Sequence, residues 1–317
     1  MDAAQEKIAV ARLSVYSNTA LVALKLVSGI FMMSVAVLSE AIHSAIDLIA
    51  ALIARYSVKK SAEPADREHR YGHGKYENLS GLIEGSLIFV AAIGIIYQAV
   101  QKIQDPDATV DFLLAGIVIM GISAVVNFFV SRRIMTVARK TESLALEADA
   151  FHLTTDVLTS VGVFVALALI QLGGPMWIDP AVAILVAAFI IHAAYDISRR
   201  STEGLLDKSL PEAEIRLIER IIRDHEHILN YHKLRARRMG SERQIDVHMI
   251  VSRNLSVKEG HDLVDHIEYE IKKELPRSSV MIHTEPCDQN CERCRMSPPD
   301  RSKPSIAGID SGCTPKE

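Results

Sequence analysis

The sequence lacks the features of a secreted or nucleic-acid-binding protein. It has only four cysteines, at positions 287, 291, 294 and 313, which excludes a disulfide framework across the fold and predicts reduced thiols in a cytosolic tail. The formal net charge of −4 gives no indication of a nucleic-acid partner. Residues 1–6 are polar and the first apolar run has no small-residue cleavage pattern, so we expect no cleaved signal peptide.

Long apolar segments are what the sequence does have. Hydrophobic residues make up 49% of the chain, only 5% of it is aromatic, and the mean hydropathy is +0.17. Most of the apolar segments are close to the about 20 residues that cross a bilayer. Six are predicted to be membrane-spanning helices: residues 13–33, 35–56, 79–103, 112–130, 146–172 and 180–195. The alternative is a soluble protein with six buried helices, and the distribution of charge disfavours it.

Positive charges fall on alternate connections between these segments. They are Arg55, Lys59, Lys60, Arg67, Arg70, Lys75, then Arg132, Arg133, Arg139, Lys140, and finally Arg199 and Arg200. The connection between the third and fourth segments is acidic instead, and residues 173–179 contain no basic residue. The positive-inside rule then predicts that both termini are cytoplasmic. The short chain, with no targeting segment, favours the bacterial inner membrane.

Two of the apolar segments contain the same polar pair, a histidine followed four positions later by an aspartate. These are His43 with Asp47 and His152 with Asp156, and residues four apart share one helix face. A charge near the bilayer centre costs about 2.5–3.5 kcal/mol on insertion scales, which makes such residues functional candidates. If the pairs face each other, two imidazoles and two carboxylates form a four-ligand site suited to zinc. The alternative is that each pair is an internal hydrogen bond holding helices together.

Such a site predicts transport. Ligands lose protons when they bind a metal, so a site that holds either metal or protons and opens alternately to each side of the membrane is an antiporter. The chain is therefore predicted to move a divalent metal across a membrane and not to be an enzyme. A membrane metalloenzyme would need an open coordination position and a separate general base, and neither Glu40 nor Glu84 is placed convincingly for that role.

Three further groups of metal-ligating residues lie outside the apolar segments. Asp66, His69 and His73 form a candidate loop site, for which the alternative is a solvated polar turn. Cys287, Cys291 and Cys294 have a spacing that suits zinc or cuprous copper, and a plain tail of reduced thiols is equally favoured. A candidate cytosolic zinc site at a dimer interface comprises His232, His248, His261, His283 and Glu285. Taken singly, each of these histidines is expected to be an ordinary surface residue.

The last third of the chain has the pattern of a soluble α+β domain. Amphipathic spacing predicts helices and alternation predicts strands, in the order α-β-β-α-β, over residues 212–227, 231–238, 244–252, 257–275 and 280–284. This order predicts a ferredoxin-like, metallochaperone-like domain that ends near Pro286. The predicted domains are a cytosolic N-terminus (1–12), an all-α six-helix transmembrane transport domain (13–205), a cytosolic α+β regulatory domain (206–286) and a disordered tail (287–317).

Several of these motifs together resemble the cation diffusion facilitator family. They are the two His-x-x-x-Asp pairs, the Tyr-Gly-His-Gly-Lys core of residues 64–75, and the sequence Glu-Ala-Asp-Ala-Phe-His at residues 147–152. The resemblance extends from about residue 8 to residue 286. It implies a homodimer with six spans per protomer, a cytosolic ferredoxin-like domain, and efflux of a divalent metal from the cytosol driven by proton entry.

Carried over residue by residue, the resemblance implies particular ligands. The transport site would be His43, Asp47, His152 and Asp156, the loop site Asp66, His69 and His73, and the cytosolic site His232, His248, His261, His283 and Glu285. Well-studied bacterial members have Asp where this chain has His43, and imidazole favours zinc over harder cations such as manganese. Relatives often have Asp at the position of Glu285, which puts its ligand role in doubt. Lys75 and Asp207 match a family salt bridge that locks protomers together near the membrane surface, for which the alternative is two unrelated surface charges.

The sequence therefore predicts a zinc/proton antiporter, with zinc both as substrate and as a regulatory ligand of the cytosolic domain. Two alternatives stay open. One is a transporter for iron, cobalt or cadmium, and the other is a non-transporting metal sensor or scaffold of the same fold.

Overall fold

The chain, studied as a computed structural model, divides into two compact units, Met1–Leu206 and Asp207–Glu317. The structure describes residues 3–31, 35–104, 114–175 and 177–287. The acidic connection between the third and fourth apolar segments, Cys291, Cys294, Cys313 and the predicted disordered tail from residue 288 lie outside the described residues.

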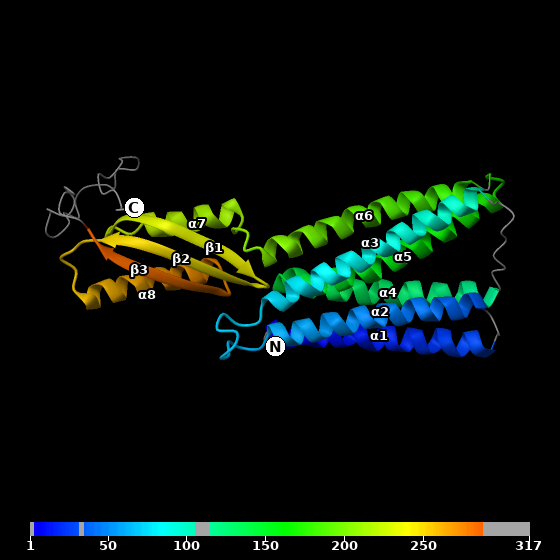
Figure 1. Cartoon of the computed structure of the whole chain (residues 1–317), viewed down its shortest axis with the longest axis horizontal. Helices are drawn as coiled ribbons and strands as arrows, with labels where there is room; N and C mark the ends of the chain where they lie inside the picture. Colours follow the sequence, from blue (N-terminus) through cyan, green and yellow to red (C-terminus); the bar gives the residue numbers. More distant parts are fainter. Residues whose placement is uncertain (1–2, 32–34, 105–113, 176, 288–317) are drawn as a thin grey trace. The chain divides into compact units, whose positions relative to one another are not determined.

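The first unit is a bundle of long helices (Figure 1). They are α1 (Ala3–Phe31), α2 (Val35–Ser61), α3 (Lys75–Gln104), α4 (Leu114–Thr141), α5 (Leu144–Gln171) and α6 (Ile178–Leu205). Within the described residues, six helices are long and apolar enough to cross a membrane, which confirms the prediction of six spans.

Most of these helices extend past the predicted bounds at their polar ends. The α1 helix begins at Ala3 rather than residue 13, and α4 ends at Thr141 rather than residue 130. Hydropathy marks only the part of a helix that lies in hydrocarbon, whereas backbone hydrogen bonding continues through the polar residues beyond it. At the start of α5, the Ser143 hydroxyl accepts a hydrogen bond from the Leu146 amide and caps the helix.

Small residues bring α3 and α6 close together. A Cβ atom at Gly81 or Gly85 of α3 would collide with the hydroxyl of Ser201 or Ser198 on α6. This close approach is typical of membrane helices, whose backbones pack where side chains are small. A separate apolar cluster that includes Val58, Ile134 and Leu153 joins α2, α4 and α5, and so holds together the helices that carry the two His-Asp pairs.

The second unit has the predicted order of elements, α-β-β-α-β (Figure 1). The elements are α7 (Glu212–Arg223), β1 (Ile228–Met239), β2 (Glu242–Val251), α8 (Val257–Glu274) and β3 (Ser278–Pro286). The sheet has the order β1-β2-β3, with β1 antiparallel and β3 parallel to the central strand β2. The predicted α+β fold is therefore confirmed.

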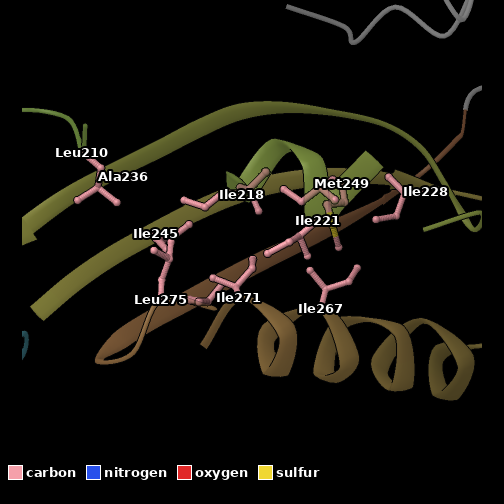
Figure 2. Close-up of a cluster of buried hydrophobic side chains, with 13 residues drawn as sticks. Leu210, Ile218, Ile221, Ile228, Ala236, Ile245, Met249, Ile267, Ile271 and Leu275 are labelled. Atoms are coloured by element: carbon pink, nitrogen blue, oxygen red, sulfur yellow. The ribbon is translucent and has the colours of Figure 1, made fainter. Parts of the chain in front are cut away.

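Both helices of this unit pack on one face of the sheet. Figure 2 shows Ile218 of α7 and Ile267 and Ile271 of α8 gathered around Ile245 and Met249 of β2, and all five side chains are buried. Side chains alternate between the faces of a strand, so Asp246 and His248 project to the opposite face, which α7 and α8 do not cover.

Candidate metal centres

Three of the four predicted transport ligands meet between α2 and α5. The Nε2 atom of His152 on α5 lies 2.9 Å from Oδ1 of Asp47 on α2, and the two residues are only 8% and 4% exposed. Asp156 follows one helical turn after His152, and one ligand atom from each of the three residues lies within 4.8 Å of the others. Because α2 and α5 pack against each other, Asp47 of the first pair meets both members of the second.

His43 occupies a different position. Its side chain is exposed and lines the same cavity as Asp47 and Asp156, but its nitrogens are not among the converging ligand atoms of the described residues. The cavity has a volume of about 100 Å³ and lies among α1, α2, α4 and α5. Although His43 is one turn from Asp47 on the same helix face, it lines the cavity without joining the ligand cluster.

Two polar neighbours of the cavity were not singled out from the sequence. Asn127 of α4 donates a hydrogen bond from Nδ2 to Oδ2 of Asp156 at 3.2 Å. Lys25 of α1 donates from Nζ to the Ser44 hydroxyl at 2.8 Å and lies 3.3 Å from Oε2 of Glu40. The available signals were Lys25 as the only charged residue of segment 13–33 and Asn127 as the only amide of segment 112–130, because such groups need a buried partner.

The arrangement of Asp47 and His152 has a chemical consequence for any metal that binds there. Their hydrogen bond holds a proton between a carboxylate oxygen and an imidazole nitrogen, and both of these atoms are potential metal ligands. A cation that used both atoms would have to displace that proton. The mixed set of nitrogen and oxygen donors suits zinc and related borderline cations.

The predicted loop residues also come together. Oδ2 of Asp66 lies 3.2 Å from Nε2 of His73, and the rings of His69 and His73 have centroids 4.5 Å apart. Oδ1 of Asp66 accepts hydrogen bonds from the backbone amides of His69 and Glu68, at 2.6 Å and 2.9 Å, and these lower the pKa of Asp66. His73 is buried, and neither of its ring nitrogens makes a well-aligned hydrogen bond. A deprotonated carboxylate beside an unsatisfied imidazole is a set that can accept a cation.

The cytosolic group is built by strand register. His232 of β1 and His283 of β3 are each paired with His248 of β2, so the three rings stand side by side on the uncovered face of the sheet. Ring centroids are 5.2 Å apart for the first pair and 4.8 Å for the second. Glu285 accepts a hydrogen bond from Nδ1 of His248 at 2.7 Å, which lowers the pKa of that carboxyl.

Two predicted members of the cytosolic site differ from the rest. Ligand atoms of His232, His248 and Glu285 lie within 4.8 Å of one another, while His283 is more exposed and its Nε2 lies 3.9 Å from Glu285. His261 is on α8, where it lies 3.4 Å from Asp265, and is apart from this cluster. Because α8 covers the opposite face of the sheet, His261 is not brought to the other ligands within one protomer.

The remaining predicted residues have partners of their own. Lys75 donates from Nζ to the Leu205 carbonyl at 3.2 Å, and Asp207 accepts from Nη1 of Arg237 at 2.7 Å. The salt bridge between Lys75 and Asp207 therefore stays a prediction. Cys287 is buried against Ile250, and the other two cysteines of its predicted group lie outside the described residues.

Two family models together match most of the chain. A model described as the cation efflux transmembrane domain matches residues 11–206, and one described as the cytoplasmic domain of cation efflux proteins matches residues 210–287.

Similar proteins include transporters and pumps. An uncharacterized transporter of Synechocystis sp. is 36% identical over 277 residues, which is 87% of this chain and 89% of the relative. The cation-efflux pump FieF of Shewanella oneidensis is 30% identical over 275 residues, which is 87% of this chain and 92% of the pump. A solved structure of CzrB is 30% identical and covers 25% of this chain and 98% of its own, with a TM-score of 0.24. The metal-bound C-terminal domain of CzcD from Thermotoga maritima is 28% identical and covers 24% of this chain and 94% of its own, with a TM-score of 0.23.

Proposed function

Because the chain belongs to the cation diffusion facilitator family of cation efflux proteins, we propose that it exports zinc from the cytosol in exchange for protons. Efflux of metal cations follows from the family, which is one of transporters rather than enzymes. Beyond what the family gives, we propose the identity of the metal, the coupling to protons and the ligand residues. The observation that carries this proposal is the convergence of Asp47, His152 and Asp156 from two helices at a polar cavity.

We assign the substrate site to His43, Asp47, His152 and Asp156. Three of these residues already present their ligand atoms to one another, and His43 stands on the wall of the same cavity, one turn from Asp47. A change of side-chain rotamer at His43 would add a second imidazole and complete the four-coordinate shell that zinc prefers. The nitrogen content of this set is the reason we propose zinc before iron, cobalt or cadmium.

Exchange with protons follows from the same residues. When zinc leaves, the pair of Asp47 and His152 regains the hydrogen bond seen in the structure, and that bond contains a proton. A site that releases zinc only by taking up protons, and that opens to one side of the membrane at a time, converts a proton gradient into zinc export.

We further propose how the molecule is organised. Both termini lie in the cytosol of a bacterial cell and the helices cross its inner membrane, as the distribution of basic residues indicates. The division of the chain at Leu206 and the separate family matches support a transport domain at 13–205 and a regulatory domain at 206–286. The protein acts as a homodimer, with a salt bridge between Lys75 and Asp207, and zinc bound by His232, His248 and Glu285 regulates it. The loop residues Asp66, His69 and His73 form a third zinc site.

The test is metal flux into proteoliposomes under an imposed pH gradient, with a zinc dye and a pH dye inside. We expect zinc entry and proton exit to rise and fall together in the wild type. Asp47→Ala and Asp156→Ala should reduce both fluxes to the level of empty liposomes, because each removes a ligand of the substrate. Replacing zinc with iron, cobalt or cadmium in the same assay measures selectivity.

A matched control is Asp196→Ala, which removes an exposed carboxylate of α6 that lies 3.0 Å from Arg200 and far along the sequence from the cavity residues. Its zinc flux should equal that of the wild type. Undiminished flux in both ligand variants would overturn the assignment of the site. Zinc binding without any flux in the wild type would instead favour the sensor or scaffold.

A further inference from the structure

A second group of metal-ligating side chains lies in the cytosolic unit, away from the uncovered face of the sheet. His225 is in the connection between α7 and β1, and His266 and Glu270 are one turn apart on α8. Nε2 of His225 lies 3.9 Å from Oε2 of Glu270, and Nε2 of His266 lies 3.4 Å from Oε1 of the same carboxylate. One ligand atom from each of the three residues lies within 4.8 Å of the others.

The ring of His225 is held in the orientation that a metal ligand needs. Its Nδ1 lies 2.7 Å from the backbone carbonyl of Ile221, and because a carbonyl only accepts, Nδ1 carries the proton. The lone pair is then on Nε2, the nitrogen that faces Glu270. Metal-ligating histidines commonly donate their other N–H group to a carbonyl in this way, which fixes both the tautomer and the ring.

Core packing fixes the spacing of the three residues. Ile221 and Ile222, at the end of α7, belong to the same buried cluster as Ile267 and Ile271, which directly follow His266 and Glu270 on α8 (Figure 2 labels Ile221, Ile267 and Ile271). Ligand side chains that are supported by a packed core need little reorganisation to bind an ion. The rings of His225 and His266 meet edge to face with centroids 5.3 Å apart, which leaves the carboxylate beside both.

The chemistry of the set selects a cation. Two imidazole nitrogens and one carboxylate oxygen are the donors that zinc and related borderline divalent ions accept. The side chain of His225 is only 14% exposed, whereas those of Glu270 and His266 are 40% and 58% exposed, so the open side of the group faces solvent. A solvent molecule can complete a tetrahedral shell from that side.

We propose that His225, His266 and Glu270 form a metal site that binds a divalent cation of the zinc class and ties the connection between α7 and β1 to α8. The site is separate from the cluster of His232, His248 and Glu285, because α8 packs against the opposite face of the sheet from that cluster. Metal binding at this site does not require transport, so its test is independent of the proposed efflux activity.

The test uses the full chain in detergent, with zinc alone as the probe, in a background that carries Asp47→Ala and His248→Ala. Bound zinc is measured by elemental analysis after dialysis against a weak chelator, and hydrogen exchange is followed by mass spectrometry. We expect zinc to slow exchange in α8 and in the residues between α7 and β1. The double variant His225→Ala/His266→Ala should lose one zinc per chain together with that protection.

The matched control is His227→Ala, which removes an exposed histidine two positions along the same connection and outside the group. It should retain both the zinc and the protection. Glu270→Gln is a second variant that preserves the shape of the side chain. We expect it to weaken zinc binding by about 10-fold or more, since loss of a group that only supports a metal ligand already costs that much. Equal zinc content and equal protection in the double variant and in the His227→Ala control would overturn the proposal. The exchange pattern without zinc shows whether each variant is folded.

Discussion

At the residue scale, the two carboxylates of the candidate transport site are held in different ways. Asp47 is bound to another candidate ligand, His152, whereas Asp156 is held by the amide of Asn127, which comes from a third helix. An outer partner of this kind orients a ligand oxygen without binding the metal itself. We therefore expect Asn127 to act as a positioning residue, whose loss affects how tightly the substrate is held rather than whether it can be bound.

Replacing Asn127 with alanine should raise the KM for zinc by about 10-fold to 100-fold, the usual cost of losing an outer partner, with a smaller effect on flux at saturating zinc. The measurement is initial zinc flux in proteoliposomes as a function of zinc concentration. Ser123→Ala is the control, because Ser123 lines the same cavity from the same helix but its hydroxyl donates to the Ile119 carbonyl. If the two variants had the same KM, Asn127 would have no role in positioning Asp156.

At the scale of secondary structure elements, one carboxylate joins α7 to two strands. Glu214, in the first turn of α7, accepts hydrogen bonds from Nε and Nη2 of Arg243 on β2, at 2.8 Å and 3.0 Å, and from Nη2 of Arg238 on β1 at 3.1 Å. These bonds, Arg243 first, lower the pKa of Glu214. Arg243 is buried, so removing the carboxylate would leave a guanidinium without its compensating charge.

Glu214→Gln should destabilise the packing of α7 on the sheet by about 1–3 kcal/mol near neutral pH. Breaking a buried pair costs about 3–5 kcal/mol, and the partial exposure of Glu214 to solvent reduces that cost. A carboxyl whose pKa is lowered by folding stabilises the fold above its unfolded pKa, and this contribution is lost as the pH falls through the folded pKa. The difference in stability between the Glu214→Gln variant and the wild type should therefore become smaller as the pH falls.

Hydrogen exchange of α7 and β2 in the full chain, corrected for the intrinsic effect of pH, measures this difference. Glu212→Gln is the control, since Glu212 is in the same helical turn and is exposed. Among the described residues its ion pair is with Arg216, at 3.5 Å, and not with a strand. A difference between Glu214→Gln and wild type that stayed constant from neutral to acid pH would contradict the linkage to this carboxyl.

At the scale of the whole molecule, two kinds of metal group lie in two separate units. The candidate transport ligands belong to Met1–Leu206, and the histidine cluster on the sheet belongs to Asp207–Glu317. If the first group carries the substrate and the second senses zinc, the two roles can be separated by mutation.

The double variant His248→Ala/Glu285→Ala should still transport zinc when zinc is saturating, because the substrate ligands are intact. It should lose the zinc-dependent protection of β2 and β3 from hydrogen exchange, because it lacks two of the three clustered ligands. Asp47→Ala is the reciprocal control, with flux lost and protection of the strands retained. Loss of flux in the double variant to the level of Asp47→Ala would mean that the cytosolic cluster takes part in transport itself.

Much of this fold follows from local patterns. The six membrane spans appear as apolar runs of the length of a bilayer, and the α-β-β-α-β order appears as a change from helical periodicity to alternation near Pro211. The ends of the helices were harder to predict from the sequence, as the ten extra residues at the start of α1 illustrate. Polar residues continue a helix without raising its hydropathy.

For the sites, the sequence by itself determined which residues of one element share a face. The spacing of His152 and Asp156 on one helix and the alternation that turns His248 away from Met249 are consequences of backbone geometry that every helix or strand obeys. Only the tertiary structure decided which faces meet. Helix packing brings Asn127 to Asp156 and leaves His43 at the wall of the cavity, and core packing brings His225 to two side chains of α8. Contacts between distant segments depend on how whole elements pack, and no local pattern records that.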